Sequence, residues 1–419
     1  MKYFKVVFVF ALSVGAQAQT DRPTQPSVPP GNQTSAGSAT QTAPTDRKQG
    51  WSYDPDAGLV LQHGDFKWTS WAYGEHVFRP EGEGFWRRVR QGMEFDLPRF
   101  TKHYRSAFVY EVDFTDTNFF RNDPKSHIGE NLYVAVQDAD DPGKLRFVFG
   151  ENTHILTLED NLSSGNLPTI NRSLILEEHG SVHSFGTQFG LQVSKSITPR
   201  YTIAVSAQDN RGSLNTTIPR YVVGNDLAVK VTALVLNDAK RGRKLNLGLG
   251  LDHTRDIRNG DWTFISAVAG QTLGDAPASG NELTVEGSVS YTDRLKGHLY
   301  TLESEHLYSD FSKTGTQIPG GYVLAQYSAF DSHRKGDLDP FLRYDWLRFS
   351  TPAIGSTISQ QALRVGFNWN LPETHKLVNF HFEYARNAIT GPPVSIPLNP
   401  AKNELALELR LNVARYIRH

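Results

Sequence analysis

The chain has 419 residues, no cysteine, a formal net charge of −1 and a mean hydropathy of −0.43. The near-neutral charge disfavours nucleic-acid binding, which needs a basic surface, and the lack of cysteine excludes a disulfide framework. No long apolar segment follows the N-terminus, so the sequence also excludes a protein that crosses a membrane with helices.

The first residues have the order of features found in an export signal. Lys2 and Lys5 accompany an apolar run from Val6 to Ala16 that is too short to span a bilayer, and Ala16-Gln17-Ala18 fits the cleavage pattern. We therefore predict a signal peptide over residues 1–18. Pro, Ser, Thr and Gln dominate residues 19–50, where few apolar side chains offset the entropy of ordering, and this predicts a disordered linker.

From residue 51 onwards, apolar and polar side chains alternate in segment after segment. KLNLGLGLDH and ELALELRLNV each carry leucine or valine on one face and polar side chains on the other. About seventeen such segments, roughly nine to eleven residues each, have the length that a tilted strand needs to cross a membrane. Because bacterial barrels take an even number, we predict an all-β fold, a transmembrane antiparallel β-barrel of about sixteen strands over residues 51–419.

Aromatic residues make up 11% of the chain, and six tryptophans fall within or at the ends of these segments. Tryptophan is enriched where a barrel meets the membrane surface. We therefore predict interfacial girdles that contain Trp68, Trp71, Trp86, Trp262, Trp346 and Trp369.

One long stretch, residues 151–180, does not alternate. Long loops in compact folds are usually functional or disordered, and the leucines and isoleucines here favour a packed loop with a short helix from near Asn171 through Leu176. We predict that it folds into the barrel as a constriction loop, with Leu156, Leu158, Ile175 and Leu176 on the wall. The polar residues predicted to face the water path are Glu159, Asn161, Ser163, Ser164, Asn171 and Arg172.

Several stretches resemble successive landmarks of the phosphate-selective porin family, the polyphosphate-type porins of Gram-negative outer membranes. They are FWRRVRQGMEFDL, the loop from LRFVFGENTHIL onwards, DPFLRYDWLRF and QALRVGFNWNLPETHKLVNFHFEY. The resemblance runs through residues 51–419. It implies a sixteen-stranded barrel in the outer membrane, a homotrimer with the third loop folded inward, and passage of anions such as phosphate or polyphosphate.

If the polar face of each strand lines the pore, basic and acidic side chains are about equally common there. The predicted pore-lining cations are Arg88, Arg90, Arg146, Lys230, Arg343, Arg364 and Arg410. Closure of the ring brings both chain ends together, so Arg88, Arg90, Arg343, Arg364 and Arg410 are predicted to share one wall. A guanidinium donates two hydrogen bonds to phosphate oxygens, but cross-strand pairing with carboxylates is the alternative role for each.

These features predict passive diffusion of small hydrophilic solutes, preferably anions, with outer-membrane lipid as the surrounding partner. A non-selective general porin is one alternative, and a barrel enzyme of the phospholipase or protease type is another. The nearest residues for catalysis are Ser181, Ser184, His179 and His183, and the sequence has no nucleotide-binding, nucleophile-elbow or zinc-protease motif. We therefore predict no enzymatic activity, no cofactor and no metal.

Overall fold

The computed structural model describes residues 50–54, 58–80, 84–114, 129–141, 143–162, 167–181, 187–209, 225–257, 261–265, 267–268, 272–295, 298–328, 337–353, 355–371, 374, 377–391 and 403–412. The predicted signal peptide lies outside these residues, as does the predicted linker apart from Gly50. Ser163 and Ser164 of the predicted constriction loop also lie outside them.

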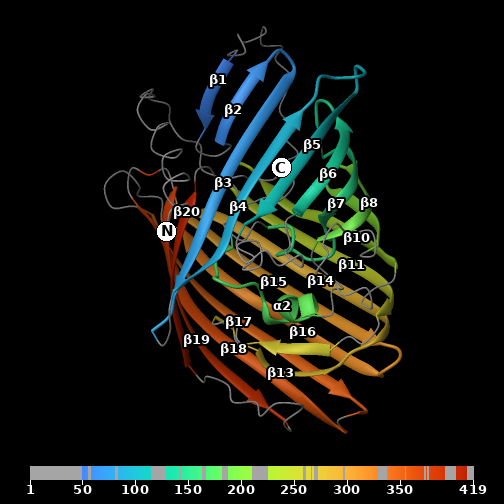
Figure 1. Ribbon diagram of the computed structural model, residues 1–419, viewed down its shortest axis with the longest axis vertical. Helices are drawn as coiled ribbons and strands as arrows, with labels where there is room; N and C mark the ends of the chain where they lie inside the picture. The colour runs from blue at the N-terminus through green and yellow to red at the C-terminus, as the bar shows by residue number, and fades with distance from the viewer. Residues whose placement is uncertain are drawn as a thin grey trace.

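Among the described residues, sixteen strands form one closed antiparallel ring (Figure 1). They are β3 (Phe66–Phe78), β4 (Phe85–Asp96), β5 (Tyr104–Asp113), β6 (Gly129–Asp138), β7 (Leu145–Thr153), β8 (Thr187–Thr198), β9 (Tyr201–Asp209), β10 (Asn225–Asp238), β11 (Arg243–Ile257), β14 (Gly280–Leu295), β15 (His298–Phe311), β16 (Thr316–Ser328), β17 (Asp337–Thr351), β18 (Ser356–Asn370), β19 (Val378–Thr390) and β20 (Asn403–Asn412).

The ring closes where β20 pairs with β3, from Leu407 opposite Phe78 to Asn412 opposite Tyr73. Two hairpins do not belong to the ring: β1 (Gly50–Asp54) with β2 (Gly58–His63), and β12 (Asp261–Ile265) with β13 (Thr272–Pro277). The helix α2 (Leu174–Ser181) follows β7. The predicted fold class is therefore confirmed, and the ring has the predicted number of about sixteen strands.

The two faces of the ring have the polarity of a membrane barrel, apolar outside and polar inside. On β17, Leu342 is 51% exposed and Tyr344 is 40% exposed, whereas Arg343 between them is fully buried. On β18, Leu363 and Val365 are exposed on either side of the buried Arg364. This arrangement is the reverse of a soluble core, and it suits a barrel whose outer face contacts lipid. No helix among the described residues is long and apolar enough to cross a membrane.

Two of the six tryptophans contradict the girdle prediction. Trp71 is buried on the inner face of β3, and it lies over Gly92 of β4, where a Cβ would come within 2.2 Å of the indole. Trp262 of the β12–β13 hairpin is buried with its ring edge-on to His179. Trp68 and Trp71 are three positions apart on β3 and therefore point to opposite faces, and the small Gly92 leaves room for the indole of Trp71 on the inner face. Trp86 and Trp369 are exposed, in agreement with the prediction.

Residues 154–162 and 167–181, together called the 154–181 segment below, pack against the inner face through apolar side chains. Leu156 lies against Gly250 of β11 and Ile175 of α2 against Gly320 of β16, and both side chains are fully buried. Figure 1 shows α2 in front of β15, β16 and β17. The helix begins three residues later than predicted, because the Ser173 carbonyl accepts the first helical hydrogen bonds, from the amides of Leu176 and Glu177.

Candidate functional site

The candidate site is the charged inner wall made by β17, β18, β19, β20, β3 and β4, which are consecutive strands of the ring. Arg343 of β17 is directly opposite Arg364 of β18. Across the closure, Glu75 of β3 is opposite both Arg410 of β20 and Arg88 of β4. The pairing of first and last strands therefore places the arginines on one wall, as predicted from ring closure.

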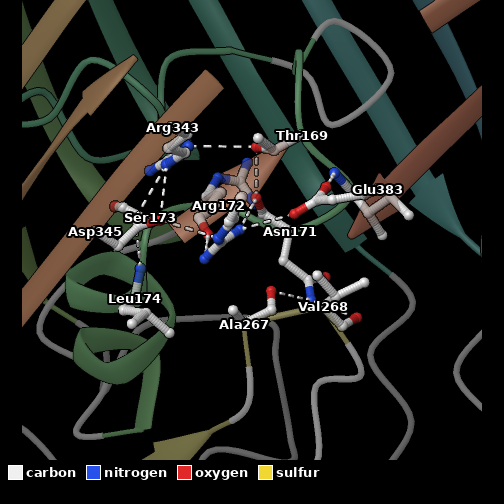
Figure 2. Close-up of polar contacts among 12 residues, drawn as sticks. Thr169, Asn171, Arg172, Ser173, Leu174, Ala267, Val268, Arg343, Asp345 and Glu383 are labelled. Atoms are coloured by element: carbon white, nitrogen blue, oxygen red, sulfur yellow. Dashed lines mark hydrogen bonds and ion pairs between the residues drawn. The ribbon is translucent and has the colours of Figure 1, made fainter. Parts of the chain in front are cut away.

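Arg343 is the centre of the wall and ties it to the 154–181 segment (Figure 2). Its guanidinium donates two hydrogen bonds to the Glu159 carboxylate, one of them at 3.3 Å, and its Nε donates to Asp345 at 3.0 and 3.1 Å. The guanidinium carbon lies 4.0 Å from the centre of the Tyr322 ring. Every side of this cation is therefore occupied by protein, and the side chain does not face water.

Arg364 and Arg410 bind backbone carbonyls of the same segment. Arg364 donates to the carbonyls of Asn171 and Arg172, both at 3.1 Å, and pairs with Asp345 at 2.9 Å. Arg410 donates to the carbonyls of Leu167 at 2.8 Å and Thr169 at 3.2 Å. The two arginines therefore fix the course of residues 167–172 and are buried beneath them.

A further arginine, Arg87, contacts the segment although strict alternation would place it on the lipid face. The register between β3 and β4 shifts after Glu75, so that Arg87 has no partner opposite it and turns inward. Its guanidinium donates to the Ile170 carbonyl and lies 3.7 Å from Glu75 and 3.9 Å from Glu408. A bulge of this kind leaves no pattern in the sequence, which is why the role of Arg87 was not predicted.

Carboxylates of the wall, together with Glu305 of β15, accept hydrogen bonds from the segment's amides. Glu383 accepts from Ile170 at 2.7 Å, Asp345 from Leu174 at 3.3 Å, and Glu305 from Leu158 at 2.7 Å. Backbone amides that are buried against the wall need such partners, since water does not reach them. The wall charges therefore serve mainly to hold the 154–181 segment.

The predicted water-facing residues of the segment are only partly where we expected them. Glu159 is 2% exposed because it pairs with Arg343, and Asn171 is buried because its amide donates to the carbonyls of Ala267 and Val268. Asn161 is exposed, and the Arg172 side chain is 17% exposed. Leu158, predicted to pack on the wall, is half-buried.

The remaining predicted cations are also paired. Arg90 binds Asp113 at 2.8 Å and Glu111 at 3.3 Å. Lys230 donates to the Leu156 carbonyl and pairs with Glu286 at 3.3 Å. Arg146 lies over the Tyr133 ring at 5.9 Å, and Arg88 lies 3.9 Å from Glu75. Pairing with a carboxylate of another strand, the alternative role derived from the sequence, therefore describes Arg88, Arg90 and Lys230. Arg343, Arg364 and Arg410 mainly bind the 154–181 segment.

The electrostatics of the segment are clearest at Glu159. Burial by itself would raise the pKa of this carboxyl, but the charge of Arg343 and the hydrogen bonds from that guanidinium outweigh burial. The pKa of Glu159 is consequently lowered from its ordinary value, and the side chain is held as a carboxylate.

His154 ties the start of the segment to β10 and β11. Its Nε2 lies 3.2 Å from Asp226 and 3.7 Å from Asp252, and the three donor groups are close enough together to suggest a metal site. Its Nδ1, however, accepts a hydrogen bond from the Leu156 amide at 3.2 Å, which leaves the ring proton on Nε2, facing the aspartates. That tautomer opposes metal binding through Nε2 and fits a hydrogen-bonded tether.

His179 ties the end of α2 to β14 and β15. Its Nδ1 lies 3.3 Å from Glu282 and its Nε2 3.2 Å from the Ser309 hydroxyl, which is the order of groups in a serine hydrolase triad. All three residues are fully buried, and Ser309 also contacts the Thr284 hydroxyl at 2.7 Å. A nucleophile enclosed in this way is out of reach of a substrate, so we interpret the group as a second tether.

No family model matches the sequence, and no curated protein resembles it. Solved structures do match. OmpT, an outer membrane protein of Vibrio cholerae, has a TM-score of 0.55 at 11% identity, over 84% of this chain and 99% of that one. OmpF of Salmonella typhi, in complex with daunomycin, has a TM-score of 0.56 at 12% identity, again over 84% and 99%.

An anion-selective porin from Comamonas acidovorans also matches, with a TM-score of 0.50 at 10% identity, over 83% of this chain and 99% of that one. Identities this low establish the fold alone. The matched folds agree with the closed ring and the apolar outer face. The chain thus has the fold of the bacterial outer-membrane β-barrels, with sixteen strands.

Proposed function

We propose that the protein is an outer-membrane porin through which small hydrophilic solutes diffuse passively. The observation that carries the proposal is the polar inner face of a sixteen-stranded ring, along one side of which the 154–181 segment is fixed. Rings of about sixteen to eighteen strands are wide enough to leave an aqueous channel, whereas rings of about eight are filled by their own side chains. We prefer a channel to an enzyme because Ser309, the serine of the triad-like group, is fully buried and cannot reach a substrate.

The 154–181 segment is proposed to be the constriction of this channel. Hydrogen bonds from Arg343, Arg364 and Arg410 hold it along most of its described length. A segment held at so many points keeps one shape while solute passes, and it narrows the water path by its own volume. Near such a narrowing a single charge acts strongly, since less water screens it.

We propose a preference for anions, with phosphate or polyphosphate as the candidate solute from the family resemblance. The supporting observation is that the side chains of Arg172, Arg88 and Arg87 are 17%, 17% and 12% exposed, whereas the carboxylates Glu75 and Glu408 beside Arg87 are fully buried. The porin from Comamonas acidovorans, which has a similar fold, is described as anion-selective, and one OmpT structure is described as a trimer form. A homotrimer is part of the proposal.

The test is the reversal potential of the purified protein in a planar bilayer under a potassium chloride gradient. We expect a potential of the sign for anion preference, and Arg172→Glu should shift it towards cations. Arg241→Glu is the matched control, because Arg241 is a highly exposed arginine in the turn between β10 and β11 and makes the same change of charge. Cation preference in the natural protein would leave a general porin, and ester hydrolysis without any ion current would favour the barrel enzyme.

A further inference from the structure

The β1–β2 hairpin continues the sheet beyond the point where the ring closes. β20 pairs with β3 only from Tyr73 to Phe78, and β2 pairs with the beginning of β3, from Phe66 to Ser70. Among the described strands, β1 pairs with β2 alone. Figure 1 shows the hairpin beside the beginning of β3 and beyond β20. The hairpin is therefore an addition to the barrel and is not needed for closure.

The hairpin lies at the rim where the connections are short. Lys67 near the start of β3 is opposite Asp96 at the end of β4, so this rim also holds the connections 97–103, 199–200 and 239–242. At the opposite rim β7, β9 and β11 end at residues 153, 209 and 257, and the next strands of the ring begin only at residues 187, 225 and 280. In outer-membrane barrels the short turns face the periplasm. The hairpin therefore lies at the periplasmic rim.

A row of apolar side chains joins the hairpin to the lipid-facing side of the barrel. In register across β1 to β5, Trp51 is opposite Leu61, Leu61 opposite Trp68, Trp68 opposite Phe95, and Phe95 opposite Phe108. The rings follow one another, with centroids 5.2 Å apart for Trp51 and Trp68, 6.4 Å for Trp68 and Phe95, and 6.0 Å for Phe95 and Phe108. The outer apolar face thus extends onto the hairpin without a break.

The outermost strand of this row ends in two exposed aromatic side chains. Trp51 is 62% exposed and Tyr53 is 37% exposed, both on the face continuous with the lipid-facing side. Tryptophan and tyrosine combine an apolar ring with a polar tip, and for that reason they gather where hydrocarbon gives way to headgroups. We propose that the β1–β2 hairpin is a membrane anchor that seats Trp51 and Tyr53 among the lipid headgroups of the periplasmic leaflet.

The absence of native cysteine allows a clean test. Single cysteines replace Trp51, Ser52 or Tyr53 in the full chain, each carries a nitroxide, and the barrel is placed in phospholipid vesicles. Ser52 is the matched control, since it is opposite Val60 on the other face of the same strand. Leu249→Cys on the outer face of β11 and Arg241→Cys in a turn give the lipid and water limits.

The readout is the ratio of nitroxide collision rates with oxygen, which concentrates in lipid, and with a water-soluble nickel chelate. We expect ratios at positions 51 and 53 between the two limits and several-fold above that at position 52. Equal ratios at all three positions would overturn the anchor. Spin–spin broadening between subunits at position 51 would also overturn it, because a second copy of the chain would then cover the hairpin. Exposed positions tolerate cysteine, and a strand-dominated circular dichroism spectrum verifies each variant.

Discussion

Replacing Arg343 with methionine should release the 154–181 segment from the wall. Methionine replaces the aliphatic part of arginine and carries no charge, so the main change is that Glu159 loses the guanidinium that binds both of its oxygens. Glu159 would keep only the Ser173 amide, at 2.7 Å, whereas Asp345 would keep Arg364 at 2.9 Å. The unpaired group in the variant is therefore the carboxylate on the segment.

The magnitude follows from the burial of Glu159, which is 2% exposed. Removing one partner of a buried ion pair costs about 3–5 kcal/mol, because the remaining charge is left without compensation. In the variant, this cost is removed when the segment leaves the wall and Glu159 becomes exposed to water. At about 1.4 kcal/mol for each tenfold change, the ratio of released to seated segment should rise by roughly 10²–10⁴.

Single-channel conductance in a planar bilayer measures the release, and Arg343→Met should open to larger steps than the natural protein. The control is the double variant Arg343→Met with Glu159→Gln, in which no buried charge is left unpaired at this contact. Its conductance should return towards the natural value. The reasoning is refuted if Arg343→Met conducts like the natural protein, or if the double variant stays as open as the single one.

Gly320→Val should destabilise the barrel by about 1–3 kcal/mol, because a Cβ there would meet the Ile175 side chain at 2.7 Å. Ile175→Ala should relieve the effect in thermal unfolding, and Gly287→Val, at a glycine with open space around it, should lower the unfolding temperature less than Gly320→Val does. Acid should release the segment: the pKa of Glu159 is lowered in the folded protein, so the stabilisation is full above the ordinary value of about 4.3 and is lost as the pH falls through the lowered value. Conductance should therefore rise in acid below about pH 4, and a Glu159→Gln variant that shows the same rise would contradict this assignment.

The sequence predicts the fold well because one physical rule, alternation across a strand, applies to every segment of the ring. It assigns Leu342 and Tyr344 to lipid and Arg343 to the interior, as the structure shows. Closure of the ring also predicts that arginines from both ends of the chain share a wall. Both predictions depend only on local periodicity and on the antiparallel pairing of first and last strands.

The sequence predicts the site less well because the site depends on contacts between distant residues. Nothing local to Glu159 indicates that Arg343, 184 positions away, binds and buries it. The bulge that turns Arg87 inward has no signature, and the burial of Trp71 depends on the glycine beside it. Side chains whose neighbours come from another part of the chain are therefore the ones that were misplaced.

The most direct test of a channel narrowed by the 154–181 segment is the single-channel conductance of the natural protein beside a variant lacking residues 161–170. The account predicts discrete, ohmic steps for the natural protein and larger steps for the deletion, since the deletion shortens the proposed constriction while the strands of the wall remain. Absence of ion current from correctly folded barrels would contradict the channel. Steps of unchanged size after the deletion would show that the segment is not the constriction.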